Sequence, residues 1–442
     1  MMALKMVRGA PPQALLALCL TCCVAPLSAA PPLQGAPQRL DDGYVPVGDI
    51  LYSAEDWACL HAKNLMSVER LWPRTEGEVK IPYIITYKEM NMTMLEEAIG
   101  AWEAKTCIKF LKMEEGDKRA EYLEFRAGGG CFTVTGYVEG EVTVSIVDTC
   151  KGRSVKHEIG HALGMRHEHK RSDRDNNVIV VRENIDPKMA SNFEFSETIN
   201  CGIPYDYFSL MHYQDTAASI NGKRVLVAKD PRFQDIMGEG TEITHWNAKL
   251  ANTMYKCVDD WLEACGQTSD PCENGGYIQK DCSCACPLGT SGDKCQEFAM
   301  SYRDALLEKY SPYTSVINTP GAEVTSPGYP NDGPQEAIRY TQVMQAPKCK
   351  KAVVTFTDFQ LGEEDDMPNC KYTSTLEIRT DVSVGDGKIF CGEGIKNQQV
   401  FKSDNSELIF HYKNYDFLGN GGENAYRGYT AVFTTEDIPG CR

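Results

Sequence analysis

Residues 157–167 read HEIGHALGMRH and place three histidines at a fixed, uncommon spacing. Positions four apart in a helix share one face, so the imidazoles of His157 and His161 can reach a single ion. We expect Gly164 to end this helix, because glycine tolerates the left-handed conformation that reverses a chain, and the turn would bring His167 round as a third ligand. Three neutral imidazoles leave the fourth position of a zinc ion open for water, which is the arrangement of a catalytic zinc site.

Glu158 follows the first of these histidines. A carboxylate at this place can face the metal-bound water and act as its general base. The alternative is an amphipathic helix with surface histidines. Only eight histidines occur in 442 residues, however, so three of them at set distances around a glycine are improbable by chance. The motif therefore predicts one catalytic zinc ion per chain.

The composition limits the partners of the chain. Its 442 residues exceed one typical domain and suggest two to four. The 45 basic and 62 acidic side chains give a net charge of −17, which argues against nucleic acid or an anionic membrane as a partner. Nineteen cysteines indicate disulfides in an extracellular environment.

Residues 1–30 have the features of a secretory signal peptide. Lys5 and Arg8 make a basic start, 14–25 is a short apolar run, and small residues at the end of the segment offer a cleavage site. This run is too short to span a bilayer and no later stretch is long enough, so we expect a soluble, secreted protein. Residues 31–63 are proline-rich and then acidic, with little core-forming periodicity, which indicates a pro-segment.

A first folded domain is expected over 64–260. Four apolar residues at helical spacing predict a helix over 94–107. Alternating apolar residues predict strands over 79–85, 108–110, 122–125, 133–134 and 142–146. After the zinc helix the periodicity weakens, so we expect an irregular second half with one helix over 244–256.

A second motif, SLMHY over 209–213, lies about forty residues after the first. Together with the extended run HEHKRSDRD over 167–175, the two motifs resemble the astacin family of zinc endopeptidases, within the metzincins. The resemblance extends from about Asn64 to Cys257. It implies an α+β fold of the metzincin type, with a twisted sheet plus helices and an irregular C-terminal half.

The resemblance also implies how the site works. His157, His161 and His167 would bind the zinc. Glu158 would take the proton of the attacking water and later hand it to the leaving amine. The protein would then be a zinc endopeptidase that hydrolyses peptide bonds.

Three residues of the second motif receive separate assignments. Met211 would form the apolar turn beneath the metal, although an ordinary core methionine needs no such role. Tyr213 would be a further zinc ligand in the resting enzyme that swings off to stabilise the oxyanion; the alternative is a core tyrosine. His212 matches no ligand position of the family, and we expect it to be structural.

Maturation is connected with the same site in the family. Glu168 would pair with the new amino terminus, which should lie near Asn64 after a trypsin-like cut behind Lys63. Asp49 would occupy the open zinc position of the zymogen. The family pattern there is Phe-x-Gly-Asp; its last two residues are present, but Pro46 stands in place of the phenylalanine.

The family's two disulfides map onto four cysteines of this domain. Cys201 and Cys59 are then left over. One hypothesis is that they pair and tether the pro-segment, and the alternative is a free, buried Cys201. The pairs implied by the resemblance are Cys107–Cys257 and Cys131–Cys150.

Substrate preference is less readable from the sequence. Many astacins carry a basic residue shortly after the Met-turn tyrosine, which is associated with acidic side chains after the cut. Residues 214–218, QDTAA, contain no base, so an acidic preference is in doubt. The strand over 132–134 can pair with an extended peptide, as edge strands do.

Six cysteines between 265 and 295 resemble an EGF-like domain, expected over 261–296. So small a unit lacks a core and depends on disulfides. The module would serve in adhesion or as a spacer, and we favour the spacer. The implied pairs are Cys265–Cys282, Cys272–Cys284 and Cys286–Cys295.

After an expected linker over 297–320, residues 321–442 resemble a CUB domain, an all-β sandwich. The segments that carry the resemblance are SPGYP, FTDFQL, FCG and RGYTAVF. Cys370–Cys391 would be one bridge, and because the usual first cysteine is missing, pairing of Cys349 and Cys441 stays open. Thr373 replaces the aspartate of calcium-binding CUB domains, so we expect no calcium site of that kind.

Two function classes follow. The first is a secreted zinc endopeptidase made as a zymogen and activated by a trypsin-like protease. Its substrates would be extracellular proteins such as egg envelope, matrix or pro-proteins, and its EGF-like and CUB domains would bind protein or matrix ligands. The second is a catalytically silent binding protein that keeps the fold, but such a scaffold has no reason to retain Glu158 with all three ligands and Tyr213. Asn91 begins a glycosylation sequon.

Overall fold

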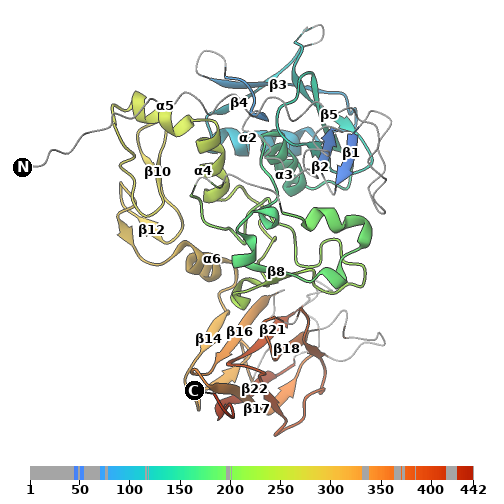
Figure 1. Ribbon diagram of the computed structural model, residues 1–442, viewed down its shortest axis with the longest axis vertical. Helices are drawn as coiled ribbons and strands as arrows, with labels where there is room; N and C mark the ends of the chain where they lie inside the picture. Colours follow the sequence, from blue (N-terminus) through green and yellow to red (C-terminus); the bar gives the residue numbers. More distant parts are fainter. Residues whose placement is uncertain are drawn as a thin grey trace, which may run out of the picture. The chain divides into compact units, whose positions relative to one another are not determined.

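The computed structural model describes the chain over 44–47, 50–53, 70–74, 78–114, 117, 119–195, 200, 202–330, 338–362, 370, 374–383, 385–414 and 426–441 (Figure 1). All of these residues belong to one compact unit, 37–442. Within them, no helix is both long enough and apolar enough to cross a membrane. The expected signal peptide and most of the expected pro-segment lie outside the described residues.

The first half of the expected protease domain is built on a seven-stranded sheet of order β1-β2-β6-β7-β5-β3-β4. Strands β3, β4, β5 and β7 run parallel, whereas β6 is antiparallel to β7. All five strands expected in this domain are present. The strand bounds are β1 Tyr44–Val47, β2 Ile50–Ser53, β3 Val79–Ile85, β4 Ile108–Lys112, β5 Tyr122–Ala127, β6 Phe132–Val134 and β7 Glu141–Ile146.

Residues 44–53, within the expected pro-segment, contribute two strands to this sheet, which their composition did not predict. Strand β2 pairs in parallel with β6, in the register Ile50 opposite Thr133 and Leu51 opposite Val134, and β1 pairs with β2. The backbone hydrogen bonds of a sheet edge need no apolar periodicity, which explains why the sequence pattern missed them.

Two helices pack together beside the sheet: α2 Met92–Lys105 and α3 Gly152–Ala162. The helix α2 buries the apolar residues that predicted it, including Trp102, whose Nε1 donates to the Lys156 carbonyl at 2.9 Å. Gly164 follows α3 with φ +94°, so the chain reverses there as expected.

The second half of the domain is irregular but well packed. A two-stranded sheet and several 3₁₀ turns surround a separate apolar core that includes Phe193, Tyr207 and Phe233. The regular elements are η2 Glu168–Lys170, η3 Arg174–Asn176, β8 Val178–Val180, η4 Arg182–Asn184, η5 Pro187–Phe193, β9 Leu226–Ala228, η6 Pro231–Phe233, α4 His245–Met254 and α5 Cys257–Ala264.

The single helix expected over 244–256 is in fact the first of two. Thr244 caps α4 with a capping box, in which its side chain accepts from the Asn247 amide and the Asn247 side chain accepts from the Thr244 amide. Lys256 then adopts φ +58° and redirects the chain, so that α5 buries Cys257 and Trp261. A left-handed lysine has no sequence signature, so the break was not predictable.

The EGF-like module is held by the three disulfides implied by the resemblance. Tyr277 and Ile278 belong to the core of the protease domain, and Lys249 Nζ donates to the Gly275 carbonyl at 2.9 Å. The module is therefore packed on the domain and is more than a loose spacer. Its strands are β10 Tyr277–Ile278, β11 Cys284–Ala285, β12 Thr290–Ser291 and β13 Glu297–Phe298.

The CUB domain is a sandwich of a five-stranded sheet, order β14-β16-β21-β18-β19, and a four-stranded sheet, order β15-β22-β17-β20. Cys370 pairs with Cys391, and Cys349 pairs with Cys441. Thr373 lies outside the described residues. The bounds are β14 Ser315–Ile317, β15 Glu323–Thr325, β16 Arg339–Gln345, β17 Lys350–Gln360, β18 Thr375–Arg379, β19 Lys388–Phe390, β20 Val400–Lys402, β21 Glu407–Lys413 and β22 Gly428–Asp437.

The stretch 297–320, expected as a linker, is structured. It contains the helix α6 Tyr302–Tyr310, whose Leu306 and Leu307 enter the core of the second half of the protease domain. It also contains β14, which pairs in parallel with β16 of the CUB domain. A nine-residue helix with three buried residues gives too weak a periodicity to be recognised from sequence.

Candidate metal centre

Three imidazoles meet at the end of α3. His157 and His161 come from the helix, and the turn at Gly164 brings His167 to them. Each offers one ligand atom, and these atoms all lie within 4.8 Å of one another. The three residues are buried, at 5%, 0% and 2% exposure.

Backbone carbonyls fix the orientation of two rings. His157 Nδ1 lies 2.8 Å from the Leu210 carbonyl oxygen and His161 Nδ1 lies 2.8 Å from the Met165 carbonyl oxygen. A carbonyl only accepts, so each Nδ1 carries the proton and each Nε2 keeps its lone pair for a cation.

The donor set fits zinc. His161 Nε2 and His167 Nε2 lie 3.1 Å apart. Because the Nε2 of His161 carries no proton, a shared cation satisfies this close approach of two ring nitrogens. Neutral imidazoles are ordinary zinc ligands, and three of them leave a position for water or substrate. Glu158, the next residue on α3 after His157, is 1% exposed.

Met211 lies beneath this helix. It is 1% exposed, and its amide donates to Ser209 Oγ at 3.0 Å. Its sulfur packs against Gly160, where an added Cβ would come within 2.8 Å of it. The SLMHY motif and the histidine motif are thereby packed together.

Tyr213 is brought to the histidines by the same segment. Its ring centroid lies 4.4 Å from that of His167 and 4.2 Å from that of His169, on which it stacks with an interplanar angle of 29°. His169 is fully buried, and its Nε2 lies 3.1 Å from the Asn192 carbonyl oxygen. Sequence reasoning missed His169, although it stands in the HEHKRSDRD run and a second histidine beside a ligand was a visible signal.

His212 is buried away from any ligand role. Its Nε2 accepts from the Tyr205 hydroxyl at 2.6 Å, and its Nδ1 donates to the Tyr213 carbonyl at 2.6 Å. Burial lowers the pKa of His212 to about 4. Both ring nitrogens are engaged by the protein, so this histidine holds the segment around Tyr213 in place.

Glu168 forms a buried polar cluster next to the third histidine. Its Oε1 accepts from Arg171 at 2.9 Å and from the Asp206 amide at 2.9 Å. Burial raises the pKa of Glu168 to about 7, although Arg171 opposes the shift. The expected partner, an amino terminus near Asn64, lies outside the described residues.

The edge beside the metal centre is occupied. Strand β6, expected to pair with a peptide, lies between β7 and the pro-segment strand β2. Asp49 immediately precedes β2 in the chain but lies outside the described residues, as do Cys59 and Cys201. The Cys107–Cys257 and Cys131–Cys150 disulfides are both present.

A three-histidine zinc site on a helix and turn, with a methionine packed beneath it and a mixed sheet beside it, defines a zinc protease domain of the metzincin type. Residues 65–256 match the peptidase family described as Astacin. The chain belongs to the astacin family.

The relatives agree with this assignment. Blastula protease 10 of Paracentrotus lividus is 30% identical over 369 residues, which cover 81% of this chain and 59% of that protein. Zinc metalloproteinase nas-36 of Caenorhabditis elegans is 34% identical over 276 residues, 61% of this chain and 43% of that protein. The chain thus spans about half the length of these curated relatives.

Among solved structures, the chain is similar to high choriolytic enzyme 1, a hatching enzyme zinc-protease from Oryzias latipes. The identity is 32%, the match covers 44% of this chain and 98% of the other, and the TM-score is 0.41.

Proposed function

We propose that this chain is a secreted zinc endopeptidase that hydrolyses peptide bonds of extracellular proteins. The observation that carries the proposal is the geometry of α3: three buried imidazoles share one point, and the buried carboxylate of Glu158 stands next to the first of them. A ligand set that only stabilised a fold would need no such carboxylate, which favours an enzyme over a silent binding protein.

Different residues of the chain perform different steps of peptide hydrolysis. Zinc held by the three histidines would polarise the scissile carbonyl and lower the pKa of a water molecule. Glu158 accepts the proton of the attacking water and delivers it to the leaving amine. Tyr213 would be a further ligand when zinc is bound in the resting enzyme, and its hydroxyl donates a hydrogen bond to the substrate carbonyl oxygen as negative charge develops there.

Strand β6 binds the substrate backbone. Its edge can hydrogen-bond an extended peptide, which would place the scissile bond beside the histidines. Because β2 pairs with that edge in the full chain, substrate and pro-segment compete for one surface. This competition supports a zymogen that is activated by a trypsin-like cut behind Lys63, with Asp49 as the residue that occupies the open zinc position and Glu168 as the partner of the new amino terminus.

The remaining assignments are also proposals. The domains are a signal peptide over 1–30 that directs secretion, a pro-segment over 31–63, a protease domain over 64–260, an EGF-like domain over 261–296 and a CUB domain over 321–442. Asn91 is exposed at the start of α2, where its side chain accepts from the Met94 amide at 3.1 Å, which suits a glycosylated residue. Egg-envelope, matrix and pro-protein substrates, and protein or matrix ligands of the EGF-like and CUB domains, fit this module order.

The test is Glu158→Gln in the secreted full chain. After trypsin activation the wild type should cleave casein, and the variant should bind zinc equally well while losing nearly all hydrolysis, because glutamine cannot accept the proton. Casein cleavage at the wild-type rate by the variant would refute the mechanism, and absence of cleavage by the wild type with zinc bound would favour the binding protein.

A further inference from the structure

The outer face of the five-stranded CUB sheet is unusual in being polar and buried. On β18, Leu376 and Ile378 point into the sandwich core, whereas Glu377 and Arg379 point to the opposite face. Glu377 and Arg379 are nevertheless 7% and 1% exposed. Charged side chains are almost never buried unless paired, so this face must meet charges of the protease domain.

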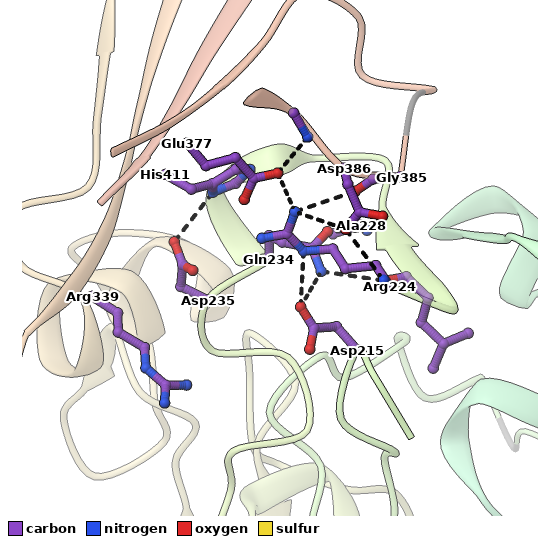
Figure 2. A network of polar contacts seen from close by, with 12 residues as sticks. Asp215, Arg224, Ala228, Gln234, Asp235, Arg339, Glu377, Gly385, Asp386 and His411 are labelled. Carbon is purple, nitrogen blue, oxygen red and sulfur yellow. Dashed lines mark hydrogen bonds and ion pairs between the residues drawn. The ribbon is translucent and has the colours of Figure 1, made fainter. Parts of the chain in front are cut away.

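Arg224 of the protease domain supplies the pairing (Figure 2). It is 4% exposed and lies between two carboxylates, one from each domain. Its Nε donates to Asp215 Oδ2 at 2.9 Å, and its Nη1 donates to Glu377 Oε1 at 2.6 Å. Asp386 and the Gly385 carbonyl of the CUB domain complete its surroundings, at 3.8 and 3.2 Å.

A second polar contact lies beside the first. His411 of β21 and Thr341 of β16 both bond to Asp235 of the protease domain, at 3.3 and 2.7 Å. His411 Nε2 lies 3.1 Å from a nitrogen of Arg379, which can only donate, so Nε2 accepts and Nδ1 carries the proton towards Asp235. The directions of these hydrogen bonds are thus defined, and the contact between the domains is a specific network.

This network reaches the segment that carries Tyr213. Asp215 stands two positions after Tyr213, and its carbonyl accepts from the Val225 and Leu226 amides at 2.7 and 3.0 Å. Its side chain accepts from Arg224 and from Gln234. Arg224 therefore helps to fix the position of the Asp215 side chain, and Glu377 helps to fix the position of Arg224.

A parallel connection starts one residue earlier. Gln214 donates to Glu239 at 3.3 Å, and Glu239 also accepts from Arg339 of the CUB domain at 3.3 Å. Next to it, Gly238 at φ +72° lies so close to the Tyr213 carbonyl that no Cβ would fit. Because Arg339 and Glu239 are partly exposed, this contact is weaker than that of Arg224.

We propose that the CUB domain positions Tyr213 for catalysis, with Glu377 and Arg224 as positioning residues that act through Asp215. The inference rests on the proposed function, because it concerns the tyrosine that the mechanism uses. Glu377 is not among the residues assigned to zinc or substrate. Without Glu377, the buried Arg224 would lose its nearest carboxylate and change position. Asp215, which is bonded to Arg224 and stands two residues after Tyr213, would move with it.

The experiment is a double-mutant cycle in the full, trypsin-activated chain. The variants are Glu377→Gln, Tyr213→Phe and the two together, and kcat and KM are measured with a quenched fluorescent peptide chosen from the casein cleavage sites. Glu377→Gln should lower kcat at least about fivefold, since small misplacements of a catalytic group cost one to two orders of magnitude. In the Tyr213→Phe background the same change should lower kcat less than twofold.

Asp358→Asn is the matched control. Asp358 is also paired with an arginine, Arg427 at 2.8 Å, and among the described residues its bonding partners Tyr329 and Arg427 both belong to the CUB domain, so kcat should stay at the wild-type value. If Glu377→Gln is not secreted, Glu377→Asp enters the same cycle, because it keeps the charge and shortens the reach to Arg224.

The outcomes distinguish a failure of the positioning role of Glu377 from a failure of the proposed role of Tyr213. An unchanged kcat in the folded Glu377 variant, or an equal loss in both backgrounds, would overturn the positioning role. If Tyr213→Phe itself left kcat unchanged, the role of Tyr213 in the proposed function would fail instead.

Discussion

The sulfur of Met211 lies against α3 at Gly160, so closely that an added Cβ would come within 2.8 Å of it and within 3.2 Å of the Trp102 ring. The contact joins the SLMHY segment to the helix that carries His157 and His161. Met211 can approach α3 this closely only because residue 160 is a glycine and has no side chain.

We predict that Gly160→Ala destabilises the protein by about 1–3 kcal/mol, since overpacking a closed interior forces side chains or backbone to move. The measurement is the free energy of unfolding in urea. Gly100→Ala in α2 is the control: nothing lies within 4 Å of its added Cβ, so it should stabilise the helix by about 0.5–1 kcal/mol. A Gly160→Ala protein as stable as the Gly100→Ala protein would show that the packing is loose.

The contact between Glu377 and Arg224 should make stability depend on pH. Burial alone would raise the pKa of Glu377, but Arg224 and the Gly387 amide outweigh it and lower the pKa to about 2. A depressed carboxyl pKa contributes stability above the unfolded value of about 4.5, and this stability is lost as the pH falls towards 2. The difference between the folded and unfolded pKa corresponds to roughly 3 kcal/mol.

The pH effect is measured as the stability difference between wild type and Glu377→Gln from pH 6 to pH 3. The difference should shrink with falling pH, because only the wild type loses a charge at this position. Every other titratable group is common to both proteins, so its contribution cancels in the difference. A difference that stays constant over this range would contradict the depressed pKa.

The two disulfides of the protease domain should differ in how much each contributes to the free energy of unfolding. Cys107–Cys257 closes a loop of 150 residues and Cys131–Cys150 one of 19. The loop-entropy relation gives about 5 and 3 kcal/mol for these lengths. Replacing each pair by alanines should therefore cost more stability for the first than for the second in urea unfolding, and the reverse order would count against a chain-entropy origin.

The histidine motif made the metal centre predictable because its information is local. Helical spacing brings His157 to His161, and a glycine reverses the chain towards His167. The cysteine spacing of the EGF-like module was informative for the same reason. The break at Lys256 and the short helix α6 could not be foreseen, since each depends on packing partners remote in sequence.

The contact between the protease and CUB domains could not be predicted from the sequence. Arg224 and Glu377 are 153 positions apart, and each alone is an ordinary surface charge in the sequence. The stacking of His169 on Tyr213 similarly depends on a turn whose path no local pattern describes. Sequence identified the residues of the chemistry, whereas the structure identified what holds them.

The central claim is that His157, His161 and His167 bind a zinc ion on which hydrolysis depends. The most direct measurement is elemental analysis of the trypsin-activated protein together with casein cleavage, before and after treatment with a chelator and after zinc is returned. The account predicts one zinc per chain, parallel loss of metal and activity, and recovery of both. Absence of zinc in folded protein, or cleavage that persists after complete removal of the metal, would contradict it.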